Sequence, residues 1–165
     1  MTGANVQASH LDPIDVQLLE ILQHDATRTL DELGKAVGLS GSAVQRRIKQ
    51  HERSGLIRRI AAQLDPDMAL VPMTVLTLVT IERDTGPDIE SLHERIRDHP
   101  NVQQCYEVAG LFDLALIITA RTMADYRRIT SELLDADANV RRFVSHVTLG
   151  TVKATLAVPL TSPPM

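Results

Sequence analysis

The hydrophobic periodicity of this chain changes once, at the segment Leu64-Asp65-Pro66-Asp67. Before this segment, apolar residues recur every three or four positions, which is the spacing of one helix face. After it, apolar and polar residues alternate from Pro72 to Glu82, which is the pattern of a half-buried strand. This change of period predicts a helical domain followed by a domain of mixed α and β structure.

The length of 165 residues is enough for one or two small domains. We expect two, joined by a linker and flanked by a disordered N-terminal tail and a short C-terminal tail. In chain order the predicted parts are the tail 1–10, the helical domain 11–64, the linker 65–71, the second domain 72–160 and the tail 161–165.

Three helices are predicted in the N-terminal domain. Asp12 is placed to cap the first one, directly before a proline that suits the first helical position. The second is the short helix Leu30–Val37, ended by Gly38, and Ser40 caps the third. Helices joined by so tight a turn are typical of a helix-turn-helix.

The third helix, which we expect to end near Arg53, has two different faces. Val44 and Ile48 are four residues apart and face the core. The outward face carries hydrogen-bonding and cationic side chains at positions i, i+3, i+4 and i+7, namely Ser42, Gln45, Arg46 and Lys49. Such groups suit the base edges and phosphates of DNA. The segment that follows, Leu56–Leu64, is predicted to be a short hairpin or an extended arm.

Charge is unevenly distributed along the chain, although the net charge is only −4. Between Gly41 and Ile60 there are six basic residues and one acidic residue, whereas from Asp65 onward nine basic residues face fourteen acidic ones. A basic segment inside an acidic protein is the pattern expected for phosphate contact. On charge alone, an ordinary solvated helix face is an equally good interpretation.

The second domain is predicted to have the order βαββαβ, which is the ferredoxin-like arrangement. The expected elements are the strand Pro72–Glu82, a helix around Ile89–Ile96, the strands Val102–Ala109 and Leu114–Ala120, the helix Met123–Leu134 and a long strand Phe143–Ala157. The two helices cover one face of the sheet. The other face carries too many apolar residues for contact with solvent, so we expect it to pack against a second copy of the chain.

Several classes of protein are disfavoured by the composition. The single cysteine, Cys105, cannot form an internal disulfide or a multi-thiolate zinc site, and we expect it to be buried rather than reactive. There is no nucleophile–base motif, no glycine-rich phosphate loop and no metal-ligand cluster among the six histidines, so no catalytic role, cofactor or metal is predicted. Neither a membrane span nor a secretory signal is recognisable, which predicts a soluble cytoplasmic protein.

These motifs together resemble the family of the leucine-responsive regulatory protein and AsnC. The resemblance extends from about Leu11 to Leu160. Its parts are Leu11-Asp12-x-x-Asp15, the run Gly38-Leu39-Ser40-x-Ser42-x-Val44-x-Arg46-Arg47-Ile48-Lys49, Gly55-Leu56-Ile57, Leu64-Asp65-Pro66, Val108-x-Gly110-x-x-Asp113, Val152-Lys153 and Pro159-Leu160. The order and spacing of the motifs carry the match, since none is unique by itself.

The resemblance implies a winged helix-turn-helix followed by a ferredoxin-like domain that binds an effector and forms oligomers, an α+β fold overall. It implies a homodimer, assembling to an octamer, that reads a pseudo-palindromic site in double-stranded DNA. It also implies a small-molecule effector, an amino acid or related metabolite, bound between C-terminal domains. The matching DNA-contact positions are Ser40, Ser42, Gln45, Arg46, Arg47 and Lys49, of which Arg47 and Lys49 are expected on phosphates.

The resemblance places effector-binding positions in two stretches of the second domain: Glu107, Gly110, Asp113 and Met123 in the first, and Ser145, His146, Val147 and Thr148 in the second. Asp113 is suited to accept hydrogen bonds from an ammonium group, while hydroxyls and backbone N–H groups can donate to a carboxylate. Other roles are open for some of them: a turn cap for Asp113, core packing for Met123, and an interface position for His146.

This chain departs from the family pattern at four positions. His51 stands where leucine is usual, on the inward stripe of the third helix, so looser packing or an edge position is expected there. Ile60 and Val71 replace an aromatic residue and a glycine, and Glu107 replaces an apolar residue, which hints at a polar or basic effector. An architectural protein that wraps DNA without any effector is the alternative function.

Overall fold

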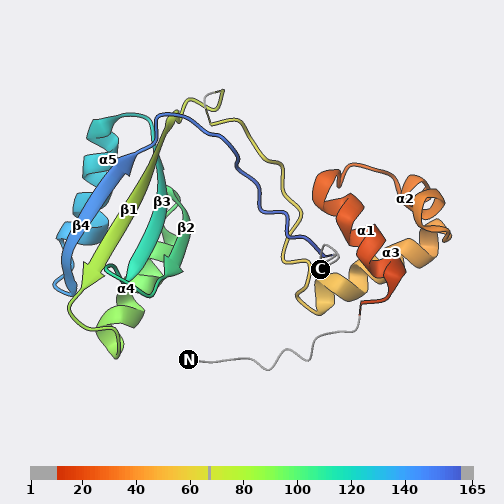
Figure 1. The fold of residues 1–165 in the computed structure, drawn as a ribbon, viewed down its shortest axis with the longest axis horizontal. Coiled ribbons are helices and arrows are strands. Elements are labelled where there is room, and N and C mark those ends of the chain that lie inside the picture. The colour runs from red at the N-terminus through yellow and green to blue at the C-terminus, as the bar shows by residue number, and fades with distance from the viewer. Residues whose placement is uncertain (1–10, 67, 161–165) are drawn as a thin grey trace. The chain divides into compact units, whose positions relative to one another are not determined.

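The computed structural model describes residues 11–66 and 68–160, which divide into two compact units (Figure 1). The first unit contains residues 11–62 and 154–160, and the second contains the described residues of 63–153. The predicted tails lie outside the described residues. Residues 154–160, which were predicted as the end of the second domain, pack with the helical unit in the structure.

The first unit is built on three helices, α1 (Pro13–His24), α2 (Leu30–Val37) and α3 (Gly41–Arg53). The predicted caps are confirmed: the Asp12 carboxylate accepts from the backbone N–H of Asp15, and the Ser40 hydroxyl accepts from that of Ala43. The core lies between the three helices, where Leu18, Leu33, Val37 and Val44 are buried.

The tight turn between α2 and α3 depends on two glycines. Gly38 ends α2 with a φ of +71°, a left-handed conformation that side chains rarely adopt. A Cβ on Gly34 would lie 2.5 Å from the carbonyl oxygen of Leu39, so only glycine lets the chain fold back this closely. The predicted turn of the helix-turn-helix is thereby confirmed.

The segment after α3 is an extended arm. Among the described residues of 54–72 there is no strand, so the hairpin that was the other prediction for Leu56–Leu64 does not form here. The chain's last described segment also lies in this unit, on α1. The Gln23 amide group accepts from the backbone N–H of Val158 at 2.7 Å and donates to its carbonyl at 3.0 Å, and Glu20 accepts from the N–H of Leu160 at 3.0 Å.

The second unit is a four-stranded antiparallel sheet in the order β2-β3-β1-β4 with helices on one face (Figure 1). Its elements in chain order are β1 (Met73–Ile81), α4 (Pro87–Asp98), β2 (Val102–Glu107), β3 (Leu114–Ala120), α5 (Met123–Thr130), the π-helical turn η1 (Ser131–Asp135) and β4 (Val140–Val147). This is the predicted ferredoxin-like order βαββαβ.

Two predicted elements differ from the structure. The last strand is not Phe143–Ala157, because β4 begins at Val140 and ends at Val147. The backbone N–H of Thr148 still donates to the carbonyl of Thr74. Because β1 begins at Met73, only one residue before Thr74, the chain after Thr148 has no further β1 residues to pair with. The predicted helix Met123–Leu134 ends in a π-helical turn, a form in which one more residue fits into the turn.

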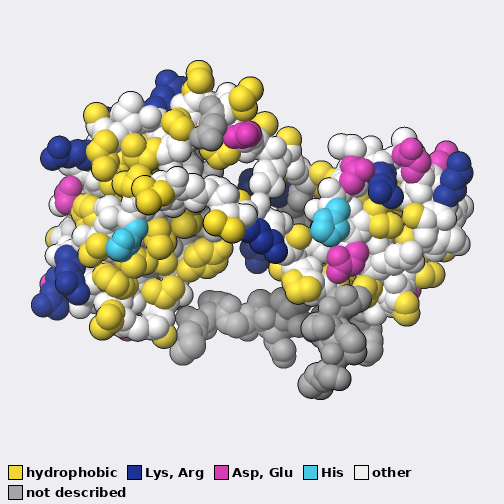
Figure 2. All heavy atoms as spheres, turned by 45° about the horizontal axis from the view of Figure 1, so that its top comes forward, with side chains coloured by type: hydrophobic (Ala, Val, Ile, Leu, Met, Phe, Trp, Pro, Cys, Tyr) yellow, Lys and Arg dark blue, Asp and Glu magenta, His cyan; other side chains and the backbone are white. Residues whose placement is uncertain are grey.

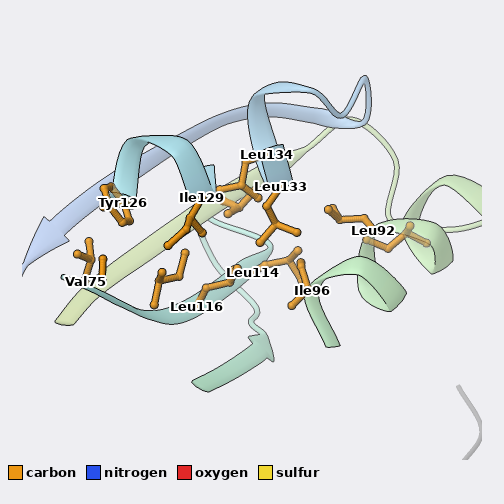
Figure 3. Close-up of a cluster of buried hydrophobic side chains, with 13 residues drawn as sticks. Val75, Leu92, Ile96, Leu114, Leu116, Tyr126, Ile129, Leu133 and Leu134 are labelled. Atoms are coloured by element: carbon orange, nitrogen blue, oxygen red, sulfur yellow. The ribbon is translucent and has the colours of Figure 1, made fainter. Parts of the chain in front are cut away.

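The core of this unit lies between the sheet and the helices (Figure 3). It is aliphatic apart from Tyr126, and its labelled members are Val75, Leu92, Ile96, Leu114, Leu116, Tyr126, Ile129, Leu133 and Leu134. The Tyr126 hydroxyl lies 2.8 Å from the buried hydroxyl of Thr77 and 2.5 Å from that of Ser145. These three hydroxyl groups form hydrogen bonds with one another, so they join α5 to β1 and β4 and none of the three lacks a partner.

No helix in the described part of the second unit covers the opposite face of the sheet. Hydrophobic side chains gather on the face of the second unit that Figure 2 shows. The strand register places Leu76, Ile117 and Val144 on the side away from the buried residues Val75 and Thr77. On the two edge strands, Val144 of β4 is 37% exposed and Tyr106 of β2 is 54% exposed. The sheet thus presents an apolar surface of the predicted kind.

Candidate nucleic-acid interface and effector site

The outward face of α3 carries the side chains that the sequence placed there. Ser42, Gln45, Arg46 and Lys49 are all exposed, and Val44 is fully buried on the other side. Neither Arg46 nor Lys49 forms an ion pair with any carboxylate in the described part of the chain. The Ser42 hydroxyl lies 3.1 Å from that of Ser40. Exposed amide, hydroxyl and cationic groups on one helix can meet base edges and phosphates together.

The other polar residues near this face differ in whether their side chains are already engaged within the protein. The Ser40 hydroxyl is exposed but accepts from the Ala43 N–H, so it serves first as the cap of α3. The arm after α3 adds two exposed cations, Arg58 and Arg59, which have no ion-pair partner among the described residues. The predicted DNA-contact positions did not include Arg58 and Arg59, although both belong to the basic segment between Gly41 and Ile60.

Arg47 is not on the outward face, contrary to its predicted role on phosphates. At about 100° per residue it lies roughly 160° around α3 from Lys49. Its Nη1 atom donates to Asp12 Oδ2 at 2.8 Å and to Asp15 Oδ1 at 2.7 Å, and its side chain is only 26% exposed. These hydrogen bonds raise the pKa of Arg47. The guanidinium is therefore held by α1.

His51 is buried at the same contact, with 4% of its surface exposed. Its Nε2 atom lies 3.0 Å from Asp15 Oδ1, the oxygen that Arg47 also contacts. The looser packing expected at this position is not what the structure shows, since the histidine has a partner that leucine could not have. The sequence signal was available: an acid at Asp15 and a histidine where an apolar residue is usual.

The pKa of Asp15 is lowered from its ordinary value. Burial works to raise it, but hydrogen bonds from His51, Arg47 and the backbone of Asp12 outweigh that effect. The carboxylate is therefore ionised at neutral pH and can accept hydrogen bonds from Arg47 and His51 of α3.

Three residues of the first stretch, Glu107, Gly110 and Asp113, lie where β1 ends, whereas Met123 lies near its beginning. The Asp113 carboxylate accepts from the backbone N–H of Ile81 at 2.9 Å, as the alternative role of a turn cap requires. Gly110 has a φ of +155°, and the surrounding space is open. Glu107 is exposed and lies 3.7 Å from His93 on α4.

The second stretch lies beside the first half of β1, from Ser145 opposite Thr77 to Thr148 beside Thr74. Ser145 contacts Tyr126, and the Thr148 hydroxyl donates to the Thr74 carbonyl at 2.9 Å. Met123 starts α5 and is 47% exposed, so it is not a core residue. Two members face opposite sides of the sheet, Val147 beside Val75 on the helix side and His146 beside Leu76 on the open side.

The structure of one copy does not bring the predicted effector residues together. The Thr74 and Ile81 ends of β1 are separated by about 20 Å of strand. A single small molecule cannot contact both ends, so a site that used Asp113 together with Thr148 would need residues from more than one copy.

The described residues contain no cluster of three or more His, Cys, Asp or Glu that could hold a metal ion. No helix in the described part of the chain is long and apolar enough to cross a membrane. Cys105 is half-buried, and burial together with the charge of Glu107 raises its pKa to about 11. It is therefore a protonated thiol near neutral pH and a poor nucleophile.

An exposed basic recognition helix joined to a ferredoxin-like unit defines a helix-turn-helix regulator with a sensory domain. Residues 11–50 match the AsnC-type helix-turn-helix domain, and residues 74–158 match the Lrp/AsnC ligand binding domain. The chain therefore belongs to the Lrp/AsnC family of transcriptional regulators, as its sequence motifs predicted.

Relatives agree over nearly the whole chain. An HTH-type transcriptional regulator of Sinorhizobium fredii is 33% identical over 153 residues, covering 93% of this chain and 90% of the relative. The transcriptional regulator AzlB of Bacillus subtilis is 31% identical, covering 91% and 96%. The crystal structure of a regulator from Neisseria meningitidis in complex with L-methionine has a TM-score of 0.83 at 29% identity, covering 91% of this chain and 97% of that one.

The buried carboxylate of Asp15 gives a prediction about acid stability. Because its pKa is lowered in the folded state, it stabilises the fold above the pKa of the unfolded chain, and this stabilisation is lost as pH falls through the folded value. Asp15→Asn should therefore lower the melting temperature at pH 7, and the difference from wild type should shrink below about pH 4. Melting followed by circular dichroism at several pH values measures this.

The matched control is Asp31→Asn, which removes an exposed carboxylate from α2 of the same unit. It should change the melting temperature much less at every pH. A difference between wild type and Asp15→Asn that stayed constant from neutral to acid pH would contradict the assignment.

Proposed function

We propose that this chain is a sequence-specific DNA-binding transcriptional regulator whose oligomeric state or DNA affinity responds to an amino acid or a related small metabolite. The proposed DNA binding rests on the exposed face of α3, where Gln45, Arg46 and Lys49 lie together without partners among the described residues. The proposal gives the chain no enzymatic activity, in keeping with relatives described as transcriptional regulators.

Within this proposal Gln45, Ser42 and Arg46 read base edges, and Lys49 contacts phosphates. Glutamine can form paired hydrogen bonds with adenine and arginine with guanine, so the face has the chemistry for direct readout. Arg58 and Arg59 on the arm supply further phosphate contacts, which hold the helix in register without reading sequence. Two such units in a dimer would read a pseudo-palindromic site.

Arg46→Ala tests the DNA-binding face. The probe is the duplex that wild-type protein enriches from a random pool, here called the selected duplex, with a scrambled duplex of equal composition beside it. Loss of a base contact should weaken binding to the selected duplex by about 10- to 100-fold and relax its sequence preference. Arg127→Ala, which removes an exposed arginine from α5 of the second unit, is the control. Undiminished binding by Arg46→Ala would disprove this assignment.

The open sheet face is proposed as the dimer interface. It holds Leu76, Leu78 and Ile117 in its centre, with Val144 and Tyr106 beside them. An apolar surface shared by identical chains is self-complementary about a two-fold axis, so two copies can bury it together. Further association of dimers into an octamer is part of the proposal.

Leu78→Glu tests the interface by adding a charge at its centre. Burying an unpaired carboxylate is costly, so the variant should elute as a monomer under conditions in which wild type is at least a dimer. Light scattering coupled to size-exclusion chromatography measures the mass. Arg127→Glu adds a carboxylate on α5, on the other side of the sheet, and should leave the mass unchanged. A dimeric Leu78→Glu would remove this face from consideration.

The effector site is proposed to lie between copies of the second unit. Its two ends, near Asp113 and near Thr148, lie too far apart in one copy to share a ligand. The match to the Lrp/AsnC ligand binding domain supports a small-molecule site in this unit. Structures of the Neisseria meningitidis regulator and of a feast or famine regulatory protein from Mycobacterium tuberculosis are both complexes with L-methionine, which supports an amino acid as ligand.

Thermal melting in the presence of each of the twenty amino acids separates a sensor from an architectural protein. A ligand at about 100 times its Kd should stabilise the folded chain by about 2.7 kcal/mol and raise the melting temperature in a saturable way. The monomeric Leu78→Glu protein should lose that response if the site lies between copies. The absence of stabilisation by any amino acid would favour DNA wrapping without an amino-acid effector.

A further inference from the structure

The contact between α1 and α3 is made by one polar cluster rather than by apolar packing alone. It contains Asp12, Asp15, Arg47 and His51. Each carboxylate uses one oxygen to cap α1 and the other to hold α3: Asp12 Oδ1 accepts from the Asp15 N–H and Asp15 Oδ2 from the Asp12 N–H, which leaves Asp12 Oδ2 and Asp15 Oδ1 for Arg47.

The cluster fixes the rotation of α3 as well as its position. Arg47 and His51 are one helical turn apart on α3, and both contact Asp15 Oδ1, at 2.7 Å and 3.0 Å. Apolar contacts tolerate small sliding movements, whereas hydrogen bonds lose strength within a few tenths of an ångström or with poor angles. Two bonds to one oxygen therefore define how far α3 is turned about its axis.

We propose that Arg47 and His51 are positioning residues for DNA recognition, which act through Asp12 and Asp15 and make no contact with DNA themselves. This rests on the proposed function, in which the opposite face of α3 reads the duplex. A helix rotated by even a small angle would move Gln45 and Arg46 out of line with base edges. The cluster would then matter most for the selected duplex and little for a scrambled one, since non-specific binding depends on charge and not on register.

The direction in which one substitution changes DNA affinity separates a positioning role from a purely electrostatic one. Asp15→Asn removes a negative charge from the unit that approaches DNA. If the cluster contributed only electrostatically, binding to both duplexes should stay the same or become stronger. If the cluster positions α3, binding to the selected duplex should weaken by about tenfold while binding to the scrambled duplex does not weaken.

Salt dependence gives a second readout, which separates a positioning role from a phosphate contact. The double variant Arg47→Gln/Asp15→Asn removes one charge of each sign, so its net charge equals that of wild type. Over about 50 to 200 mM KCl, a lost phosphate contact lowers the slope of log affinity against log salt by about one. We expect the double variant to keep the wild-type slope at reduced affinity, and Lys49→Gln, which removes a proposed phosphate contact, to lower it.

A milder variant keeps the test valid if the buried substitutions unfold the unit. Asp12→Asn retains a residue that caps helices well and leaves the bonds of Asp15 intact, so the fold should persist. We expect a loss of two- to fivefold on the selected duplex with an unchanged slope. Stronger binding by Asp12→Asn and by Asp15→Asn, or a slope lowered by one in the double variant, would overturn the proposal.

These outcomes are distinct from failure of the proposed function. If wild-type protein enriched no duplex from the random pool, sequence-specific recognition itself would be wrong. If wild type prefers its selected duplex and the Asp15 variants bind it as tightly, only the positioning role fails.

Discussion

The central strand β1 determines the architecture of the second unit. It pairs with β3 along one edge and β4 along the other, and its buried residues Val75, Thr77 and Val79 form the floor of the core. Because side chains alternate, the same strand must present Leu76 and Leu78 on the opposite face. A well-packed core under the helices therefore comes with an apolar surface on the other side, and dimerisation is the proposed means of covering it.

The first unit combines apolar packing with a polar contact. Leu18, Leu33 and Val44 supply the hydrophobic core, while Asp15 joins α1 to Arg47 and His51 on α3. Buried hydrogen bonds of this kind favour one arrangement of the helices over similar ones. For a helix that has to present side chains to a duplex, a unique orientation is as important as stability.

Local signals predicted most of the fold, because caps and turns are encoded by neighbouring residues. Asp12, Gly38 and Ser40 marked the helix ends correctly, and the alternation in β1 gave its buried side. The end of β4 was missed because it depends on where β1, its distant partner, begins. Arg47 was predicted to contact phosphates from the motif that it shares with Arg46, and only the fold shows that two carboxylates on α1 hold it. The effector positions could be located along the sheet but not joined, since one copy keeps them apart.

The hydrogen bonds that Gln23 and Glu20 of α1 form with the backbone of Val158 and Leu160 bring the end of the described chain back to the helical unit. In terms of sequence, the ligand-binding unit is an insertion of 63–153 into the DNA-binding unit. Both of its ends lead back to the same helical unit, so a chain cut at one connection would still be joined through the other. A fragment that stopped at residue 62 would also lose the backbone groups that α1 binds. The DNA-binding unit is thus completed only after the ligand-binding unit has been synthesised.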